Sequence, residues 1–308
     1  MLQGMQLEGI HHITAITGDA QRNLDFYTRV LGLRLAAKTV NQDDPSVYHL
    51  FYASELGQAG SDITFFEYPG AIPGRAGAGM IHRIVHRVGG EASLDFWAER
   101  LGVAREDGSV VFADPEGLQH ELVVNRSGDE PLTAHHPEIP DEHALQGFEG
   151  VRAYSDDTAA TRAVLEQVMN ARAVDEERWE LRGERRGGWI AYDPAPLERG
   201  RQSGGTVHHI AWGTTVADHP RWEEHLTSVG IPTSGIIDRH YFHSIYFREP
   251  SGVLFEIADD APGFTVDVSL EELGSKIILP PKFEPQRAEI EKRLTPLPDP
   301  RADWAPAS

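Results

Sequence analysis

The sequence predicts an α+β fold built from four βαβββ modules in two tandem domains. The first observation behind this prediction is a fourfold repeat of short strand-like segments, namely GIHHITAIT (9–17), MIHRIVHRV (80–88), FEGVRAYS (148–155) and TVHHIAWGT (206–214). The second is that a helix-like pattern and then alternating strand-like runs follow these segments. The third is the length of 308 residues, which suits two domains of roughly 150 residues better than one core.

One helix is expected after each opening strand, at about 20–31, 92–101, 158–169 and 219–229. Gly32, Gly102 and Gly230 follow three of these segments, and acidic or polar residues precede them, which is typical of helix ends. The strands expected after the first helix are 34–40, 48–52 and 62–68, and those after the last are about 237–241, 244–248 and 253–258.

The second and fourth modules end in the same pattern, DPEGLQHEL (114–122) and EPSGVLFEI (249–257). In both, an acid–Pro–x–Gly turn leads into a strand with a glutamate four residues after the glycine. These repeats predict a first domain at 1–126, a linker rich in Pro, His and acid at 127–147, a second domain at 148–260, and a C-terminal arm at 261–308 with one helix near 285–294.

Composition excludes several classes of function. Acidic residues outnumber Lys plus Arg by 48 to 28, a net charge of −20, which argues against nucleic acid or an anionic membrane as a partner. The absence of cysteine excludes disulfides, zinc–thiolate sites, iron–sulfur clusters and thiol nucleophiles. No run approaches the roughly 18 apolar residues of a membrane span, and the N-terminus lacks the pattern of a signal peptide. We therefore expect a cytoplasmic protein.

The repeats resemble the vicinal oxygen chelate superfamily, in which paired βαβββ modules curl into a cup around a metal. The resemblance covers about residues 7–260, and its most specific parts are the two HHI starts and the two PxGxxxE ends. It implies that each domain forms a curved mixed-sheet cup.

Aligning the four opening strands shows which modules retain metal-ligand residues. The aligned position holds His12, Arg83, Gly150 and His209 in chain order. Arginine stays protonated and glycine has no side chain, so only the first and fourth modules offer a ligand. With Glu256 from the fourth module, the set is two histidines and one carboxylate, the composition of the facial triad that holds non-heme Fe(II).

Strand alternation refines this choice. It places His209 and His208 on opposite faces of their strand, so only one histidine of each pair should reach the metal. It also places the Glu256 carboxylate among apolar strand residues, where a divalent cation would compensate its charge. Thr14 shares the face of His12 and is expected near the site. Glu121 occupies the position of Glu256 in the second module, but we interpret it as structural and paired with an arginine.

Longer segments resemble one branch of the superfamily, the ring-cleaving dioxygenases of the hydroquinone 1,2-dioxygenase type. The matching segments are HHITAITGDAQRNLDFY (11–27), KTVNQDDPSVYHLFY (38–52), ITFFEYPG (63–70), TVHHIAW (206–212) and DRHYFHSIYFREPSGVLFEIA (238–258). The resemblance implies an enzyme that uses Fe(II) and O2 to open a small aromatic diol. Mn(II) could occupy the same site, and other divalent metals could be present after purification.

The resemblance also assigns residues. It implies His12, His209 and Glu256 as the metal ligands, and it implies surrounding roles for His11, Thr14, His208, Arg239 and Tyr246. Arg239 is a permanent cation that could stabilise a phenolate. Tyr246 could bind a substrate oxygen or act as a general acid.

Three other functions remain open from the sequence. A glyoxalase-like isomerase or lyase would need a fourth protein ligand, for which Glu67 is the candidate; Phe66 facing the site instead would favour the oxygenase. A non-catalytic protein that binds an aromatic compound or an antibiotic is the second, and a dioxygenase for catechols is the third. A homo-oligomer is compatible with the acidic composition, and the proline-rich arm could pack across its interface.

Overall fold

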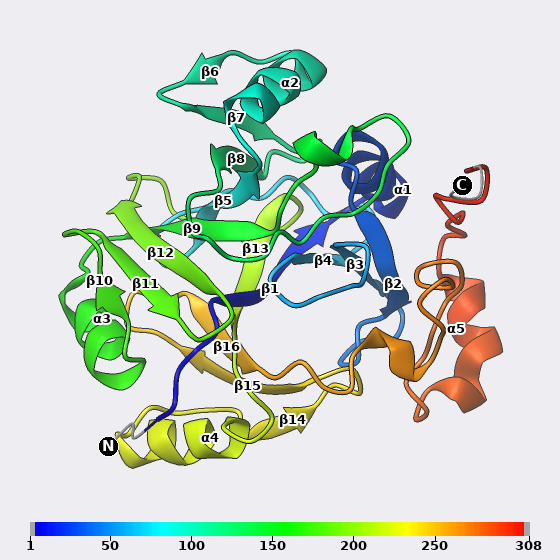
Figure 1. Cartoon of the computed structure of the whole chain (residues 1–308). Helices are drawn as coiled ribbons and strands as arrows, with labels where there is room; N and C mark the ends of the chain where they lie inside the picture. The colour runs from blue at the N-terminus through cyan, green and yellow to red at the C-terminus, as the bar shows by residue number, and fades with distance from the viewer. Residues whose placement is uncertain (1–3, 305–308) are drawn as a thin grey trace.

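The computed structural model describes residues 4–304 and contains two curled, mixed sheets of eight strands each (Figure 1). This arrangement confirms the predicted α+β fold. The first sheet has the order β14-β15-β16-β13-β1-β4-β3-β2, and the second has the order β10-β11-β12-β9-β5-β8-β7-β6.

The first sheet is built from the first and fourth modules. Their elements are β1 (Ile10–Thr17), α1 (Ala20–Asp25), β2 (Arg34–Val40), β3 (Tyr48–Ala53), β4 (Asp62–Glu67), β13 (Thr206–Gly213), α4 (His219–Ser228), β14 (Ile236–Asp238), β15 (His243–Arg248) and β16 (Leu254–Ala258). Within the first module β1 pairs in parallel with β4, and β3 and β2 follow as antiparallel neighbours. The two modules join where β1 pairs antiparallel with β13.

The second sheet repeats this architecture with the second and third modules. Their elements are β5 (Ile81–Val88), α2 (Glu91–Leu101), β6 (Arg105–Glu106), β7 (Ser109–Ala113), β8 (Gln119–Val124), β9 (Phe148–Ser155), α3 (Ala159–Ala163), β10 (Arg172–Ala173), β11 (Arg178–Arg182) and β12 (Gly187–Pro194). The modules join through the antiparallel pair β5 and β9. One sheet thus combines the first and fourth modules, and the other combines the second and third. The expected domain ranges 1–126 and 148–260 instead group the modules in chain order, the first with the second and the third with the fourth.

The helices occur where the repeats predict them, with one difference in form. The first and third continue as π-helical turns, Phe26–Val30 and Val164–Val168, so that each helical segment keeps nearly its expected length. A continuous apolar core lies beneath them and includes the fully buried rings of Trp97, Trp179, Trp212 and Trp222. None of the helices in residues 4–304 is long and apolar enough to cross a bilayer.

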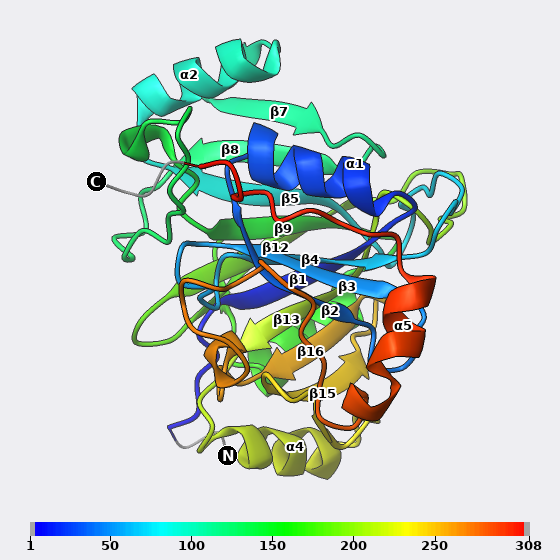
Figure 2. The same cartoon turned by 90° about the vertical axis from the view of Figure 1, so that its right-hand side faces the viewer.

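The C-terminal arm packs along the edge of the first sheet. Its helix α5 (Arg287–Arg293) lies beside β2, and the chain then continues past β2 and β3 (Figure 2). Lys38 donates to the carbonyl of Leu297 at 3.0 Å, and the Tyr48 hydroxyl donates to the carbonyl of Thr295 at 2.8 Å. The arm therefore covers an edge strand that would otherwise expose unpaired backbone groups.

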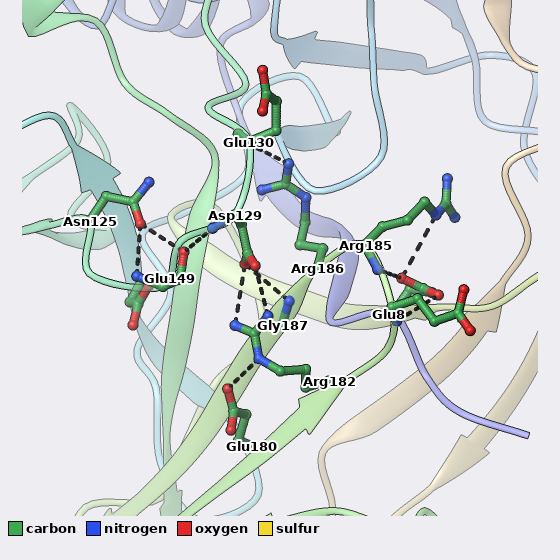
Figure 3. Close-up of polar contacts among 12 residues, drawn as sticks. Glu8, Asn125, Asp129, Glu130, Glu149, Glu180, Arg182, Arg185, Arg186 and Gly187 are labelled. Atoms are coloured by element: carbon green, nitrogen blue, oxygen red, sulfur yellow. Dashed lines mark hydrogen bonds and ion pairs between the residues drawn. The ribbon is translucent and has the colours of Figure 1, made fainter.

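The segment 127–147 is held against the second sheet by a buried carboxylate. Asp129 accepts hydrogen bonds from Arg87 at 2.8 Å, from Arg182 at 2.7 Å and from the backbone N–H of Gly187 at 3.1 Å. Figure 3 shows Asp129 with Arg182 and Gly187, together with Arg186, which donates to the carbonyl of Glu130 at 2.7 Å. Asp129, Glu130, Arg182 and Arg186 line a cavity of about 880 Å³. The negative charge of Asp129 is compensated by its ion pairs with Arg87 and Arg182.

Candidate metal centre

Both double-histidine pairs lie at irregularities where β1 meets β13. His11 is one extra residue on β1, and His208 is one extra residue on β13. Such bulges re-aim side chains locally. As a result the His11 and His12 rings approach to 3.0 Å between their Nδ1 atoms, and His208 and His209 approach to 2.8 Å. Regular alternation predicts that His208 points away from His209; the bulge instead brings the two rings together.

Three ligand atoms meet at the join of the two modules. His12 on β1, His209 on β13 and Glu256 on β16 come from adjacent strands. The Nε2 atoms of the two histidines are 3.3 Å apart, and they lie 3.2 and 3.0 Å from Glu256 Oε2. All three side chains are buried, and within residues 4–304 they form the one cluster of metal-ligating groups that meets these distances.

The donor atoms fit a divalent metal ion. The Oε1 atom of Glu256 accepts a 2.5 Å hydrogen bond from the Ser244 hydroxyl, but Oε2 has no hydrogen-bond donor among the described residues. An unpaired buried carboxylate oxygen is costly unless a cation satisfies it. Oε2 faces the Nε2 atoms of His12 and His209, which are the atoms that bind metal in neutral imidazoles. One divalent cation would satisfy all three groups.

Electrostatics favours the protonation states that a metal requires. Burial by itself would raise the pKa of Glu256, but the adjacent His12 and His209 hold that pKa well below its usual value. Burial lowers the pKa of His209. It also lowers the pKa values of His11 and His208 to about 4, each with a further contribution from the neighbouring histidine. The carboxylate is thus ionised while His209, His11 and His208 are neutral at pH 7.

These contacts also define how His11 and His208 can act. If the Nε2 atoms of His12 and His209 bind a metal, their protons reside on Nδ1. Each Nδ1–H then donates to the Nδ1 atom of the preceding histidine. Partners of this kind fix the tautomer and orientation of a ligand imidazole. The structure therefore gives His11 and His208 a physical basis for the roles implied by the resemblance.

The candidate ligands His12 and His209 line a small cavity of about 40 Å³. Tyr246 and Arg239 form one wall, where the Arg239 guanidinium lies 5.4 Å from the centre of the Tyr246 ring. Burial raises the pKa of Tyr246, so its hydroxyl stays protonated. The cavity is closed partly by the loop that carries Asp43, which forms an ion pair with Arg239 at 3.1 Å.

Thr14 lies close to the candidate ligands, because it pairs with His209 across β1 and β13. It is fully buried but is not among the residues that line the small cavity. Its hydroxyl instead contacts the Thr64 hydroxyl at 2.8 Å, and Thr64 contacts Nε2 of His49 at 2.9 Å. His49 does line the cavity. The Thr14 hydroxyl is therefore connected to the cavity wall through Thr64 and His49.

Phe66 lines the cavity and Glu67 does not. The Phe66 ring centre lies 6.4 Å from that of His209 and 5.6 Å from that of His208. The Glu67 carboxylate accepts a hydrogen bond from the backbone N–H of Ala20 at 3.2 Å, at the start of α1. Glu67 is thus engaged away from the ligand atoms, and the alternative that favours oxygenase chemistry is the one observed.

Within residues 4–304 the second sheet has no equivalent cluster of metal-ligating residues. Arg83 pairs with Glu121 at 3.0 Å, so Glu121 has the arginine partner expected for it. At Gly150, the position that aligns with His209, the Trp189 ring fills the space: a Cβ atom there would lie 2.2 Å from it. The Arg83–Glu121 ion pair and the Trp189 indole therefore occupy the positions that the metal ligands occupy in the first sheet.

Sequence reasoning missed several residues around the centre. Ser244 orients the carboxylate, Asp43 holds Arg239, and His49 lies in the cavity wall with Thr64 behind it. The available signal was the KTVNQDDPSVYHLFY segment, whose polar residues precede an aromatic strand. Without the register of β3 against β4, that segment did not indicate which side chain faces the metal.

Comparison with known proteins agrees with this geometry. A family model described as the Glyoxalase/Bleomycin resistance protein/Dioxygenase superfamily matches residues 9–102 and 81–257. The chain belongs to this superfamily. MhqA of Bacillus subtilis, named as a ring-cleaving dioxygenase, is 39% identical over 95% of this chain and 100% of its own length. The chlorohydroquinone/hydroquinone 1,2-dioxygenase of Sphingobium indicum is 29% identical, over 92% of this chain and 95% of that protein.

Solved structures of the superfamily support the same conclusion about the fold. A Bacillus subtilis protein described as a dioxygenase matches with a TM-score of 0.88 and 38% identity, over 96% of this chain and 99% of that one. Glyoxalase I from Zea mays matches with a TM-score of 0.54 and 16% identity, over 82% of this chain and 92% of that one. The maize match shows a shared fold only.

Proposed function

We propose that the protein is an Fe(II)- and O2-dependent ring-cleaving dioxygenase that acts on a hydroquinone-like aromatic diol. The observation that carries this proposal is the buried triad of His12, His209 and Glu256 beside a cavity with Phe66 in its wall. Two histidines and one carboxylate leave coordination positions open for substrate and O2. The relatives named as ring-cleaving dioxygenases support the same reaction class.

Fe(II) bound by these ligands would supply the one-electron chemistry that allows O2 to react with an aromatic diol. The residues around the ligands have tasks that follow from their positions. Arg239 provides a permanent positive charge close to the cavity, which favours the ionised form of a phenol. Tyr246 retains its proton because burial raises its pKa, so it can donate a hydrogen bond to a substrate oxygen or act as a general acid.

The cavity must open before a ring can enter. Its volume of about 40 Å³ has room for only a few water molecules. The loop residues Gln42 and Asp43 close it, because Gln42 donates to the carbonyl of Arg239 at 2.5 Å and Asp43 pairs with the Arg239 side chain. Movement of this loop would admit the substrate, and its return would exclude bulk water from the reacting groups.

The proposal includes Fe(II) as the native metal, with Mn(II) as the alternative, and a cytoplasmic location. An isomerase is less favoured because Glu67 contacts α1 rather than the ligand atoms. Dioxygenase activity toward catechols and binding without turnover are outcomes that the same experiment distinguishes.

The test is O2 uptake by protein reconstituted anaerobically with Fe(II), with hydroquinones and catechols offered in parallel. We expect O2 consumption and a ring-opened product with a hydroquinone. The matched controls are His12→Ala and His209→Ala, which should lose both metal and turnover, and His82→Gln in the second sheet, which should lose neither. Metal-loaded protein that consumes no O2 with any diol would contradict the proposal.

A further inference from the structure

His49 is a cavity residue with no task in the chemistry described above. It lies on β3, which is separated from the β1 ligand His12 by β4. Two strand spacings of about 4.8 Å place the backbones of β1 and β3 about 10 Å apart. Tyr246 lies on β15, toward the opposite end of the same sheet, and Arg239 directly follows β14 at that end. His49 therefore forms a wall that faces the ligands from the other side.

The ring of His49 is held in a fixed orientation. It packs between Phe51 and Phe66, with ring centres 4.0 and 4.4 Å away. Its Nε2 atom is 2.9 Å from the Thr64 hydroxyl, which in turn lies 2.8 Å from the Thr14 hydroxyl. Burial lowers the pKa of His49 well below its usual value, so the ring is neutral at pH 7.

The other ring nitrogen, Nδ1, has no hydrogen-bond partner within residues 4–304. Each threonine hydroxyl can donate or accept, so the chain from Thr14 through Thr64 can run in either direction. If Thr64 donates to Nε2 of His49, the ring proton is on Nδ1, which can then donate a hydrogen bond. If Nε2–H of His49 donates to Thr64, Nδ1 is unprotonated and can accept one. A neutral imidazole supported in this way can pair with a hydroxyl group in either of its two roles.

His49 lines the same cavity as the candidate ligands His12 and His209, and this placement suits one class of diol better than another. In a catechol the two oxygens are on adjacent carbons, and both can bind one metal ion. In a 1,4-diol the oxygens are on opposite ends of the ring, so the second hydroxyl extends away from the metal and needs its own polar partner. Phe51 and Phe66 flank His49 with apolar surface on the same wall.

We propose that His49 binds the second hydroxyl of a 1,4-diol, with Thr64 and Thr14 holding its ring, and that this contact selects hydroquinones. The proposal rests on the function proposed above and specifies its substrate class. His49 is then a specificity-determining residue, and Thr14 and Thr64 are positioning residues that act through it.

The test is a binding cycle that changes the protein and the ligand independently. Hydroquinone and phenol, which lacks the second hydroxyl, are titrated anaerobically into the metal-loaded wild type and into His49→Phe, which keeps an aromatic wall but removes the nitrogens. We expect the wild type to prefer hydroquinone by about five- to tenfold, the usual value of one hydrogen bond, and the variant to bind both equally. Thr64→Val should reduce the preference by a smaller factor.

The control variant is His82→Gln, which replaces a histidine that pairs with Asp193 on the second sheet. It should keep the wild-type preference, and all variants should keep the metal content. An unchanged preference in His49→Phe would overturn this inference while leaving the dioxygenase proposal intact, provided that the wild type still consumes O2 with hydroquinone. A wild type that binds neither ligand, or that binds both without O2 uptake, would contradict the dioxygenase proposal itself. Equal binding of hydroquinone and phenol by the wild type would overturn the role of His49.

Discussion

Ser244→Ala should weaken metal binding although Ser244 is not a ligand. Its hydroxyl donates to Oε1 of Glu256 at 2.5 Å, and both side chains are fully buried. The substitution removes one oxygen and leaves a carboxylate oxygen without this donor. Hydrogen bonds to charged groups contribute about 1.5–3 kcal/mol, and groups that orient a metal ligand typically affect metal affinity by about 10- to 100-fold. Since tenfold corresponds to about 1.4 kcal/mol, the two estimates agree.

The assay is a competition titration of Fe(II) or Mn(II) between the protein and a chelator, under anaerobic conditions. Ser93→Ala is the matched control, because Ser93 is a buried serine on α2 that bonds the carbonyl of Glu142 far along the chain from the ligands. We expect the dissociation constant to rise about 10- to 100-fold in Ser244→Ala and to stay unchanged in Ser93→Ala. A change below about threefold in a folded Ser244→Ala protein would show that this hydroxyl does not orient the ligand, and the reasoning would fail.

Three further predictions concern the loop, the linker and the second sheet. Asp43→Ala removes the ion pair between Arg239 and the exposed Asp43 carboxylate, so the free energy of unfolding should change by less than about 1 kcal/mol. Diol binding, measured by stopped flow, should become faster because the loop opens more readily. An unchanged binding rate would argue against a gating loop. In Asp129, burial would raise the pKa, but Arg182, the Gly187 N–H and Arg87 lower it to about 2. Because this folded pKa is below that of the unfolded chain, the stabilisation is present above about pH 4 and is lost as the pH falls toward 2. Asp129→Asn should thus lower the free energy of unfolding by about 2 kcal/mol at pH 7. It should also make that free energy depend less on pH between about pH 4 and 2, which denaturant titrations at several pH values measure. A variant whose stability falls as steeply as that of the wild type would contradict this role of Asp129. Glu121→Gln should leave metal content at the wild-type value by elemental analysis, since Glu121 pairs with Arg83; a loss of metal would mean that the second sheet also binds it.

The ligand residues could be predicted because the chain provides its own internal comparison. Four aligned strands show imidazoles at His12 and His209 and incompatible residues at Arg83 and Gly150. The structure brings these two histidines and Glu256 to within hydrogen-bonding distance of one another. The helix positions were predictable for a similar reason, because glycine and polar boundaries recur in each module.

The contacts around the ligands were less predictable because they depend on register and on distant segments. The bulges at His11 and His208 cannot be recognised from the alternation of residues in the sequence, yet they determine which histidine rings come into contact. Asp43 and Arg239 are 196 residues apart and meet only because the first and fourth modules share a sheet. Sequence periodicity describes each module separately, so it could not indicate which modules pair.

The two sheets separate the contribution of the backbone from that of the side chains. The second sheet has extra residues at the same two places, His82 on β5 and Glu149 on β9, so its backbone repeats the irregularities of the first. The same backbone geometry is therefore not sufficient for a metal site. In the second sheet Trp189 occupies the space at Gly150, and Arg83 supplies a fixed positive charge. Changing Arg83 to histidine alone would give one imidazole beside Glu121, with the indole still in place of the second. A metal site of the same kind there would require replacement of Arg83, Gly150 and Trp189 together, so the two sheets share a backbone but differ in the side chains that a metal needs.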